Sequence, residues 1–188
     1  MKRLLSLLVV LALFFAITAA GESKKNGSDG DVGKNSKTEK PKEINWMSYD
    51  EGLKLARESG KHIFVNFTTK WCGYCKKMNV TTFAEPEVVE MLSDHFISIK
   101  VDGDSKNELD INGYKITERD LSVAEFRVRG YPTYWLLKPD GEKLGYVSGY
   151  QQSGNFLDML FFMKESLYDK MKFEDYMKNG GRKAYSKG

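Results

Sequence analysis

The chain has 188 residues, of which 41% are hydrophobic and 13% aromatic, so it is long enough for one domain with a substantial core. Its formal charge of +3 falls to +1 without Lys2 and Arg3, which carry the only charges among the first 20 residues. A nearly neutral chain without a Gly-rich phosphate loop lacks the concentrated basic face that nucleic-acid binding requires, so no nucleic-acid partner is expected.

Residues 1–20 have the pattern of a secretory signal peptide. A short positive segment at Lys2 precedes an apolar run that ends at Ile17, and small residues follow up to Gly21. The run is shorter than the roughly 20 residues of a membrane-spanning helix. We therefore expect a cleaved signal and a location in the periplasm or the extracellular space. The alternative is an uncleaved signal that anchors the protein in a membrane.

Residues 21–42 are rich in Gly, Ser, Asn and Lys, and Val32 is their single apolar residue. Such a segment cannot bury enough apolar surface to fold, so we expect a flexible linker. A folded domain is predicted at 43–170. The C-terminal segment 171–188 should hold a short helix near Phe173 to Lys178 and a frayed tail.

The predicted domain begins with a helix. The spacing of Ser48 and Glu51 is that of a capping box, and Gly60 marks the end of the helix. An apolar, β-rich strand is predicted at 62–68, and a Cys-x-x-Cys motif then opens a second helix, which should run to about Thr82. The remaining elements are a helix from Pro86, a strand at 96–101, a loop or small hairpin at 102–120, a short helix at 121–128, strands at 133–138 and 142–150, and a terminal helix at 155–170.

These elements predict an α/β fold with a mixed central sheet of four to five strands flanked by helices. The strands at 62–68 and 96–101 are joined by helices and can be parallel. The turn signal at Pro139 to Gly141 makes the last two strands an antiparallel hairpin. The segment at about 103–121 is an insertion into this plan, and it is either a partner-selecting loop or a neutral surface addition.

Cys72 and Cys75, the only two cysteines, indicate redox chemistry. A bridge between them closes too small a loop to constrain the unfolded chain much, so a purely structural disulfide is a weak explanation. A zinc site needs about four ligands, and only His62 and His95 could join the cysteines. A helix start lowers the pKa of a thiol, so we expect Cys72 to attack disulfides and Cys75 to resolve the mixed disulfide, without metal or organic cofactor.

Two segments resemble the thioredoxin family. Residues 64–76, with Trp-Cys-Gly-Tyr-Cys at their centre, are similar to its active-site strand and helix, and residues 128–133 are similar to its cis-proline loop. The resemblance covers roughly residues 44–168 and implies a thioredoxin fold. Within the family, the chain looks most like exported, SoxW-type periplasmic thioredoxins and like the C-terminal thioredoxin domain of the thiol:disulfide interchange protein.

The resemblance implies roles for the residues around the cysteines. Trp71, Gly73 and Tyr74 would shape a substrate groove. A cis Pro132 would present the backbone of Tyr131 to an extended substrate segment, as a short β-pairing.

Asn66 stands where the family usually has a buried aspartate, which accepts the proton of the second cysteine. An amide cannot ionise, so we expect Cys75 to lose its proton to water or to the leaving thiolate. Asn66 is thus a candidate for the proton route. Ser98 takes the place of the family's lysine partner, which would make the buried pair neutral.

Together these features predict an exported thiol:disulfide oxidoreductase that reduces protein disulfides. The Gly73-Tyr74 dipeptide lacks the histidine that, by resemblance, marks oxidising and isomerising relatives. A reductase outside the cytosol needs electrons, so a membrane thiol-transfer protein is the expected donor, and we expect a monomer. A disulfide oxidase or isomerase is the alternative within this class, and a non-catalytic thioredoxin-like binding module is the alternative outside it.

Overall fold

A computed structural model describes residues 42–186 of the chain. The predicted signal peptide at 1–20 and all but the last residue of the predicted linker at 21–42 lie outside the described residues. Between residues 42 and 186, no helix combines the length and the apolar character needed to cross a membrane.

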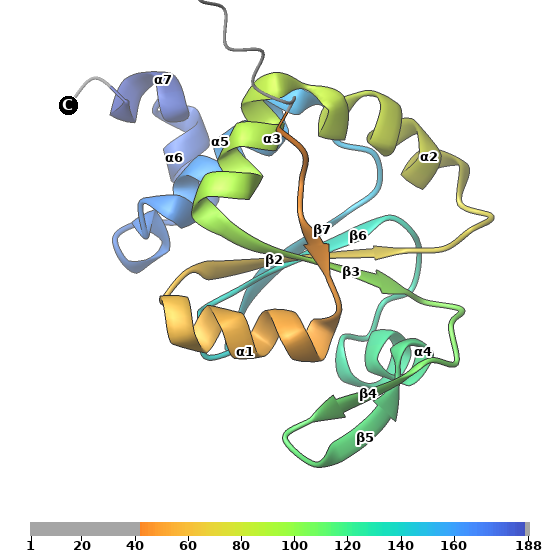
Figure 1. The fold of residues 1–188 in the computed structure, drawn as a ribbon. Coiled ribbons are helices and arrows are strands. Elements are labelled where there is room, and N and C mark those ends of the chain that lie inside the picture. The colour runs from red at the N-terminus through yellow and green to blue at the C-terminus, as the bar shows by residue number, and fades with distance from the viewer. Residues whose placement is uncertain (1–41, 187–188) are drawn as a thin grey trace, which may run out of the picture. The chain divides into compact units, whose positions relative to one another are not determined.

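A five-stranded mixed sheet forms the centre of the fold, in the order β1-β3-β2-β6-β7 (Figure 1). β1 and β2 run parallel to β3, whereas β6 runs antiparallel to both β2 and β7. The predicted mixed sheet is therefore confirmed. Its strands are β1 (Trp46–Met47), β2 (His62–Thr68), β3 (Phe96–Asp102), β6 (Thr133–Leu137) and β7 (Lys143–Ser148).

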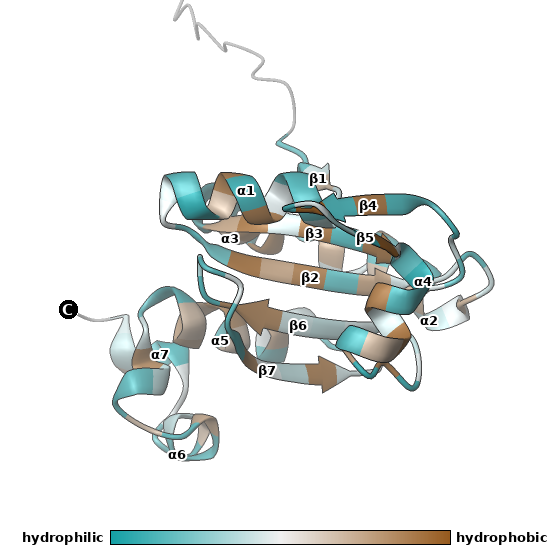
Figure 2. Cartoon of the chain, turned by 90° about the horizontal axis from the view of Figure 1, so that it is seen from below, coloured by the Kyte–Doolittle hydropathy of each residue, from teal (hydrophilic) through white to brown (hydrophobic). Residues whose placement is uncertain are grey.

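Helices cover both faces of this sheet. In Figure 1, α1 lies below the sheet and α2 and α3 lie above it. α1 turns hydrophobic residues toward the sheet and hydrophilic ones outward (Figure 2). The helices and turns up to the end of α5 are α1 (Tyr49–Ser59), α2 (Gly73–Val80), η1 (Thr82–Ala84), α3 (Pro86–His95), α4 (Glu118–Asp120), the π-helical turn η2 (Leu121–Glu125) and α5 (Ser153–Lys164).

β2 lies at the centre of the sheet and is buried on both faces. Val65 and Phe67 pack in one core cluster with residues of α1 and η2. Phe64 belongs to the other cluster, together with residues of α2, α3 and α5, and its ring meets that of Phe156 from α5. A strand covered on both sides has no polar face, which explains why its sequence is a continuous apolar run rather than an alternating one.

α1 begins and ends where the sequence predicts, but its cap differs. Ser48 is the N-cap residue, yet its hydroxyl donates to the carboxylates of Asp50, at 2.6 Å, and Glu51, at 2.9 Å, and caps no backbone N–H group. The capping-box prediction is thus wrong, because hydrogen bonds to charged acceptors are the stronger ones. Gly60 ends the helix in a left-handed conformation, as predicted.

The predicted insertion folds as a hairpin. It consists of β4 (Glu108–Ile111) and β5 (Tyr114–Thr117), which form a two-stranded sheet of their own. The turn residues Asn112 and Gly113 both have positive φ angles, 57° and 88°, which suits a two-residue hairpin turn. Leu109 is buried in the core cluster beneath α1, so the hairpin is packed against the domain.

The predicted helix at 155–170 is shorter than expected. α5 ends at Lys164, and Ser166 then takes a left-handed conformation with a φ of 49°. A 3-10 turn, η3 (Leu167–Asp169), follows. The prediction was wrong here because apolar spacing continues to Leu167, although the backbone turns after Lys164.

The C-terminal segment is more ordered than a frayed tail. It contains the predicted short helix as α6 (Phe173–Lys178) and a further helix, α7 (Arg182–Tyr185). Tyr176 is fully buried and packs against the ring of Phe162 from α5. Aromatic packing therefore holds α6 and α7 on the domain.

Candidate redox site

Cys72 and Cys75 form a disulfide, with an S–S distance of 2.07 Å, where the chain passes from β2 into α2. Cys72 is the N-cap residue of α2, and its sulfur accepts the backbone N–H of Cys75 at 3.0 Å. Both residues are buried, with exposures of 4% and 5%. The amide groups and the dipole at a helix start favour negative charge, so this position would stabilise a thiolate on Cys72.

The loop before β6 reaches the same end of the sheet. Thr133 pairs with Phe67 near the end of β2, which places the preceding Tyr131 and Pro132 beside the segment that leads to the disulfide. The peptide bond between Tyr131 and Pro132 is cis, as predicted. The topology therefore brings together the two segments that the sequence analysis singled out.

The other predicted groove residues surround the disulfide. Trp71 and Tyr74 are largely exposed, at 67% and 62%. Trp71 meets the ring of Tyr131 edge to face, with ring centroids 5.9 Å apart. Gly73 faces open space, since a Cβ atom there would meet no atom of residues 42–186 within 4 Å. Two exposed aromatic rings thus stand beside a buried disulfide, an arrangement that leaves room for an extended chain.

The start of the insertion also belongs to the site, which the sequence analysis missed. The carboxylate of Asp104 accepts the indole N–H of Trp71. Gly103 donates its backbone N–H to the carbonyl of Thr68 at 2.8 Å. A Cβ atom at Gly103 would lie only 1.9 Å from the hydroxyl oxygen of Tyr131, so this approach requires a glycine. The available signal was the polar turn directly after a strand that ends beside β2.

These neighbours affect the pKa of the Tyr131 hydroxyl. Burial raises its pKa above the ordinary value, and the carboxylates of Asp104 and Asp102 raise it further. The phenol therefore stays protonated well above neutral pH. It can act as a hydrogen-bond donor at the edge of the groove.

Asn66 is buried, as expected, with 3% exposure, and its side-chain oxygen has no hydrogen-bond partner in the described part of the chain. The predicted neutral pair with Ser98 is wrong, because the hydroxyl of Ser98 also lacks a partner among these residues and Ser98 lies opposite Phe64. The residue opposite Asn66 is Lys100. A cation is thus available beside the position where the family usually has an aspartate.

A cavity of about 560 Å³ lies beside Cys75. Thr69, Lys100 and Glu118 also line it, and the hydroxyl oxygen of Thr69 is buried without a partner. An open cavity of this size with several polar groups in its wall can hold water. A proton that leaves Cys75 therefore has polar groups and room for water on its path. Among residues 42–186, no three histidine, cysteine or carboxylate side chains gather as a metal site would require.

A disulfide that caps a helix after a central strand, beside a cis proline, is the geometry of a dithiol–disulfide exchange site. Residues 49–164 match the family model described as a thioredoxin-like domain. The chain belongs to this family of thioredoxin-like disulfide oxidoreductases.

Known proteins resemble the chain over its domain. It is 30% identical over 92 residues to a protein disulfide-isomerase of Hordeum vulgare, a match that covers 49% of this chain and 15% of that protein. It is 26% identical over 112 residues to the disulfide bond reductase DsbH of Chlamydia pneumoniae, covering 59% of this chain and 66% of DsbH. The solution structure of a thioredoxin from Thermus thermophilus aligns with a TM-score of 0.53 at 27% identity, over 63% of this chain and 85% of that one.

Proposed function

We propose that the protein is an exported reductase of protein disulfides that acts through Cys72 and Cys75. The observation that carries the proposal is the Cys72 sulfur at the N-cap of α2, with the cis Pro132 loop beside it. Nucleophile and substrate-pairing backbone are then adjacent, as attack on a disulfide in an extended chain requires.

The exchange converts one substrate disulfide and two protein thiols into one protein disulfide and two substrate thiols. The Cys72 thiolate attacks one sulfur of the substrate disulfide, forms a mixed disulfide and displaces the other substrate sulfur as a thiolate. Cys75 then loses its proton and attacks the sulfur of Cys72. The products are the Cys72–Cys75 disulfide and a second substrate thiol, so the substrate is reduced and the protein is oxidised.

The groove residues would hold the substrate during this exchange. The backbone of Tyr131, before the cis Pro132, pairs with an extended substrate segment. Trp71 and Tyr74 flank the segment with their exposed rings, and Gly73 leaves space above the disulfide. Binding of this kind uses main-chain groups, so it suits many protein disulfides rather than one side-chain sequence.

Proton release from Cys75 would proceed through the adjacent cavity. Asn66 cannot ionise, so it does not act as the base. Lys100 and Glu118 line the cavity together with Cys75. Water in this space would carry the proton to the leaving thiolate or to solvent, with Asn66 as a buried neutral neighbour.

The reductive direction follows from the Gly73-Tyr74 dipeptide, which offers no imidazolium to stabilise the reduced form. The name of DsbH, a disulfide bond reductase, agrees with this direction, whereas the relative from Hordeum vulgare is named an isomerase. An exported reductase must be re-reduced, so a membrane thiol-transfer protein is the proposed electron donor. A monomer is the proposed oligomeric state.

Oxidase or isomerase activity is the alternative. Two intact cysteines argue against a pure binding module.

Reduction of insulin disulfides, with dithiothreitol as electron donor, tests the proposal. We expect the Cys72→Ser variant to lose turnover and the Cys75→Ser variant to accumulate mixed disulfides on Cys72. No rate above the dithiothreitol background would contradict catalysis. The equilibrium potential against glutathione tests the direction, with about −270 mV expected for a reductase and about −120 mV for an oxidase.

A further inference from the structure

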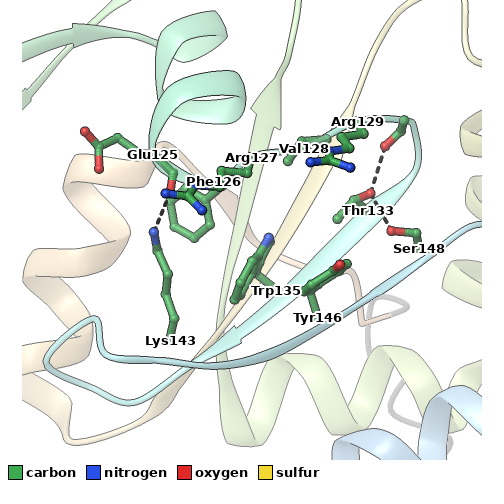
Figure 3. A pocket seen from close by; sticks show the side chains of 11 residues that line it. Glu125, Phe126, Arg127, Val128, Arg129, Thr133, Trp135, Lys143, Tyr146 and Ser148 are labelled. Atoms are coloured by element: carbon green, nitrogen blue, oxygen red, sulfur yellow. Dashed lines mark hydrogen bonds between the residues drawn. The ribbon is translucent and has the colours of Figure 1, made fainter.

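A second pocket lies beside the cis-proline loop, on the side of β7 (Figure 3). Its volume is about 680 Å³. Gly130 and Thr133, the residues on either side of Tyr131 and Pro132, are among those that line it. It shares no lining residue with the cavity beside Cys75. We call it the arginine pocket, after Arg127 and Arg129 in its wall.

The charge of the arginine pocket is mainly positive. Arg127 and Arg129 are exposed, and neither forms a hydrogen bond or ion pair with its side chain among residues 42–186. Lys143 is the third cation, and it is fixed in the wall: its ammonium donates to the carbonyl of Glu125 at 2.6 Å and lies 4.2 Å from the ring centroid of Phe126. The carboxylate of Glu125 points away from the pocket (Figure 3).

The floor of the pocket consists of two aromatic side chains, and one of them carries a buried hydrogen-bond donor. Trp135 and Tyr146 pack together with ring centroids 4.8 Å apart. The indole N–H of Trp135 is buried, yet it has no hydrogen-bond partner within residues 42–186. A buried donor without a partner costs free energy unless something else satisfies it. Trp135 therefore offers an N–H group to an acceptor that enters the pocket.

The end of η2 brings Arg127 into the pocket wall. Arg127 follows Phe126, the C-cap residue of η2, and has a φ of 52°, the left-handed conformation in which many helices end. The N–H of Val128 donates to the carbonyl of Ser122 at 2.9 Å and closes this turn. The turn therefore places Arg127 in the wall of the pocket, two residues from Arg129.

We propose that the arginine pocket binds a carboxylate side chain of the substrate protein, close to the segment that pairs with Tyr131. This inference rests on the proposed function, since the substrate must dock along the cis-proline loop. Guanidinium groups bind carboxylates through paired hydrogen bonds, and the indole N–H of Trp135 can donate to the same anion. Protein disulfides with acidic residues beside the cystine are therefore the preferred substrates.

Binding can be measured without catalysis. A cysteine-free acidic peptide is titrated into the oxidised protein, and the indole ¹H–¹⁵N signal of Trp135, assigned with the Trp135→Phe variant, is followed by NMR. We expect a saturable shift that weakens as salt is added. A matched peptide with glutamine in place of glutamate should cause no shift. An unmoved indole signal, or an equal shift with both peptides, would overturn the proposal.

Two double variants locate the effect. Arg127→Asn with Arg129→Gln removes the two guanidinium groups, and asparagine tolerates the left-handed conformation at position 127. Lys178→Gln with Lys183→Gln removes the same charge from exposed positions in α6 and α7. We expect only the arginine variant to lose the indole shift. A comparable loss in the lysine variant would mean that net charge, and not the pocket, attracts the peptide.

Kinetics connect the pocket to the substrate. Two disulfide peptides of equal length are compared, one with glutamates beside the cystine and one with glutamines. At low ionic strength we expect about fivefold higher kcat/KM for the acidic peptide, and a preference within about twofold in the arginine variant. Equal reduction of both peptides by the wild-type protein would overturn this inference alone. Failure to reduce either peptide would instead contradict the proposed function.

Discussion

Two regions are added to the central fold, and they lie at opposite ends of the sheet. The hairpin insertion lies at the end of the sheet where β2 leads into α2, whereas α6 and α7 lie at the opposite end (Figure 1). The insertion reaches the groove through Gly103 and Asp104, which contact Tyr131 and Trp71. The C-terminal region contacts α5, through Tyr176.

The comparison shows that the role of an added segment depends on which residues it contacts. Both regions contribute apolar residues to a core cluster, Leu109 in the insertion and Tyr176 in the C-terminal region. Only the insertion also holds two groove side chains in place. We therefore expect changes in the C-terminal region to affect stability alone, and changes at the start of the insertion to affect activity as well.

The largest expected effect is on stability, in the C-terminal region. Tyr176→Ala should lower the free energy of unfolding by about 3–5 kcal/mol, because it empties a fully buried aromatic site. Urea denaturation measures this loss, and insulin reduction by the folded protein should stay within about twofold of wild type. The Tyr176→Phe variant is the control. Its hydroxyl lies near the carboxylate of Asp158 but forms no hydrogen bond of normal geometry within residues 42–186, so its removal should cost little.

The comparison would fail if Tyr176→Ala reduced the kcat/KM of the folded protein strongly. Such a result would mean that the C-terminal region supports the groove from a distance. Activity is therefore measured under conditions in which the urea denaturation curve shows the variant to be folded.

The second prediction concerns the start of the insertion, where a substitution should cost less stability than Tyr176→Ala but more activity. Gly103→Ala places a Cβ atom 1.9 Å from the Tyr131 hydroxyl oxygen, so the loop and the ring must move apart. We expect a loss of about 1–3 kcal/mol in stability from overpacking. We also expect about a tenfold fall in kcat/KM for insulin, because displaced positioning groups slow a reaction strongly.

Gly154→Ala provides the matched control for this substitution. A Cβ atom at Gly154 meets nothing within 4 Å, and the residue lies in α5. Alanine is the better helix former, so stability should be unchanged or higher by about 0.5–1 kcal/mol. If Gly103→Ala lost stability without losing activity, the start of the insertion would be a purely structural addition.

The smallest effect concerns pH. His62 opens β2 and its ring lies 2.8 Å from the hydroxyl of Tyr168, which belongs to the C-terminal side of the molecule. Burial lowers its pKa, an effect that Asp169 opposes and Lys138 reinforces. The unfolded chain therefore binds a proton at a higher pH than the folded one. Stability falls as the pH drops from about 6.5 toward the folded pKa.

Urea denaturation at about pH 7.5 and about pH 5.5 measures this contribution. We expect the loss of stability between the two values to be smaller for His62→Gln than for the wild type. Insulin reduction at pH 7.5 should not distinguish the two proteins, because His62 lies far from the disulfide along β2. An identical pH response would show that His62 takes up its proton equally in both states.

Most of the fold and the centre of the site follow from local patterns in the sequence. The helix start at Cys72 could be expected from the strand and motif before it, and the cis bond at Pro132 could be expected from the resemblance to the thioredoxin family. β1, with two residues, is too short to produce a pattern. The turn after α5, where Ser166 has a φ of 49°, contains no Gly or Pro that would have predicted it.

The missed parts of the site depend on contacts between distant positions. Trp71 and Asp104 are 33 residues apart, and the link between them exists only because β2 and β3 end side by side. The register of the same two strands puts Lys100, not Ser98, opposite Asn66. Alignment with a family motif aligns residues along one chain, whereas register between strands is a property of the folded sheet.

The N-cap of α2 is a cysteine, so the sulfur that would react is also the atom that caps the helix. The sulfur of Cys72 accepts the N–H of Cys75, as an oxygen does at most helix starts. In the proposed exchange, a substrate sulfur would replace the Cys75 sulfur in the bond to Cys72, so the capping sulfur would keep its lone pairs. The same N–H would then be a donor to the disulfide, to the mixed disulfide and to the free thiolate of Cys72. Hydrogen bonds to charged acceptors are the stronger ones, so this cap would favour the thiolate most and make Cys72 a good leaving group as well as a good nucleophile.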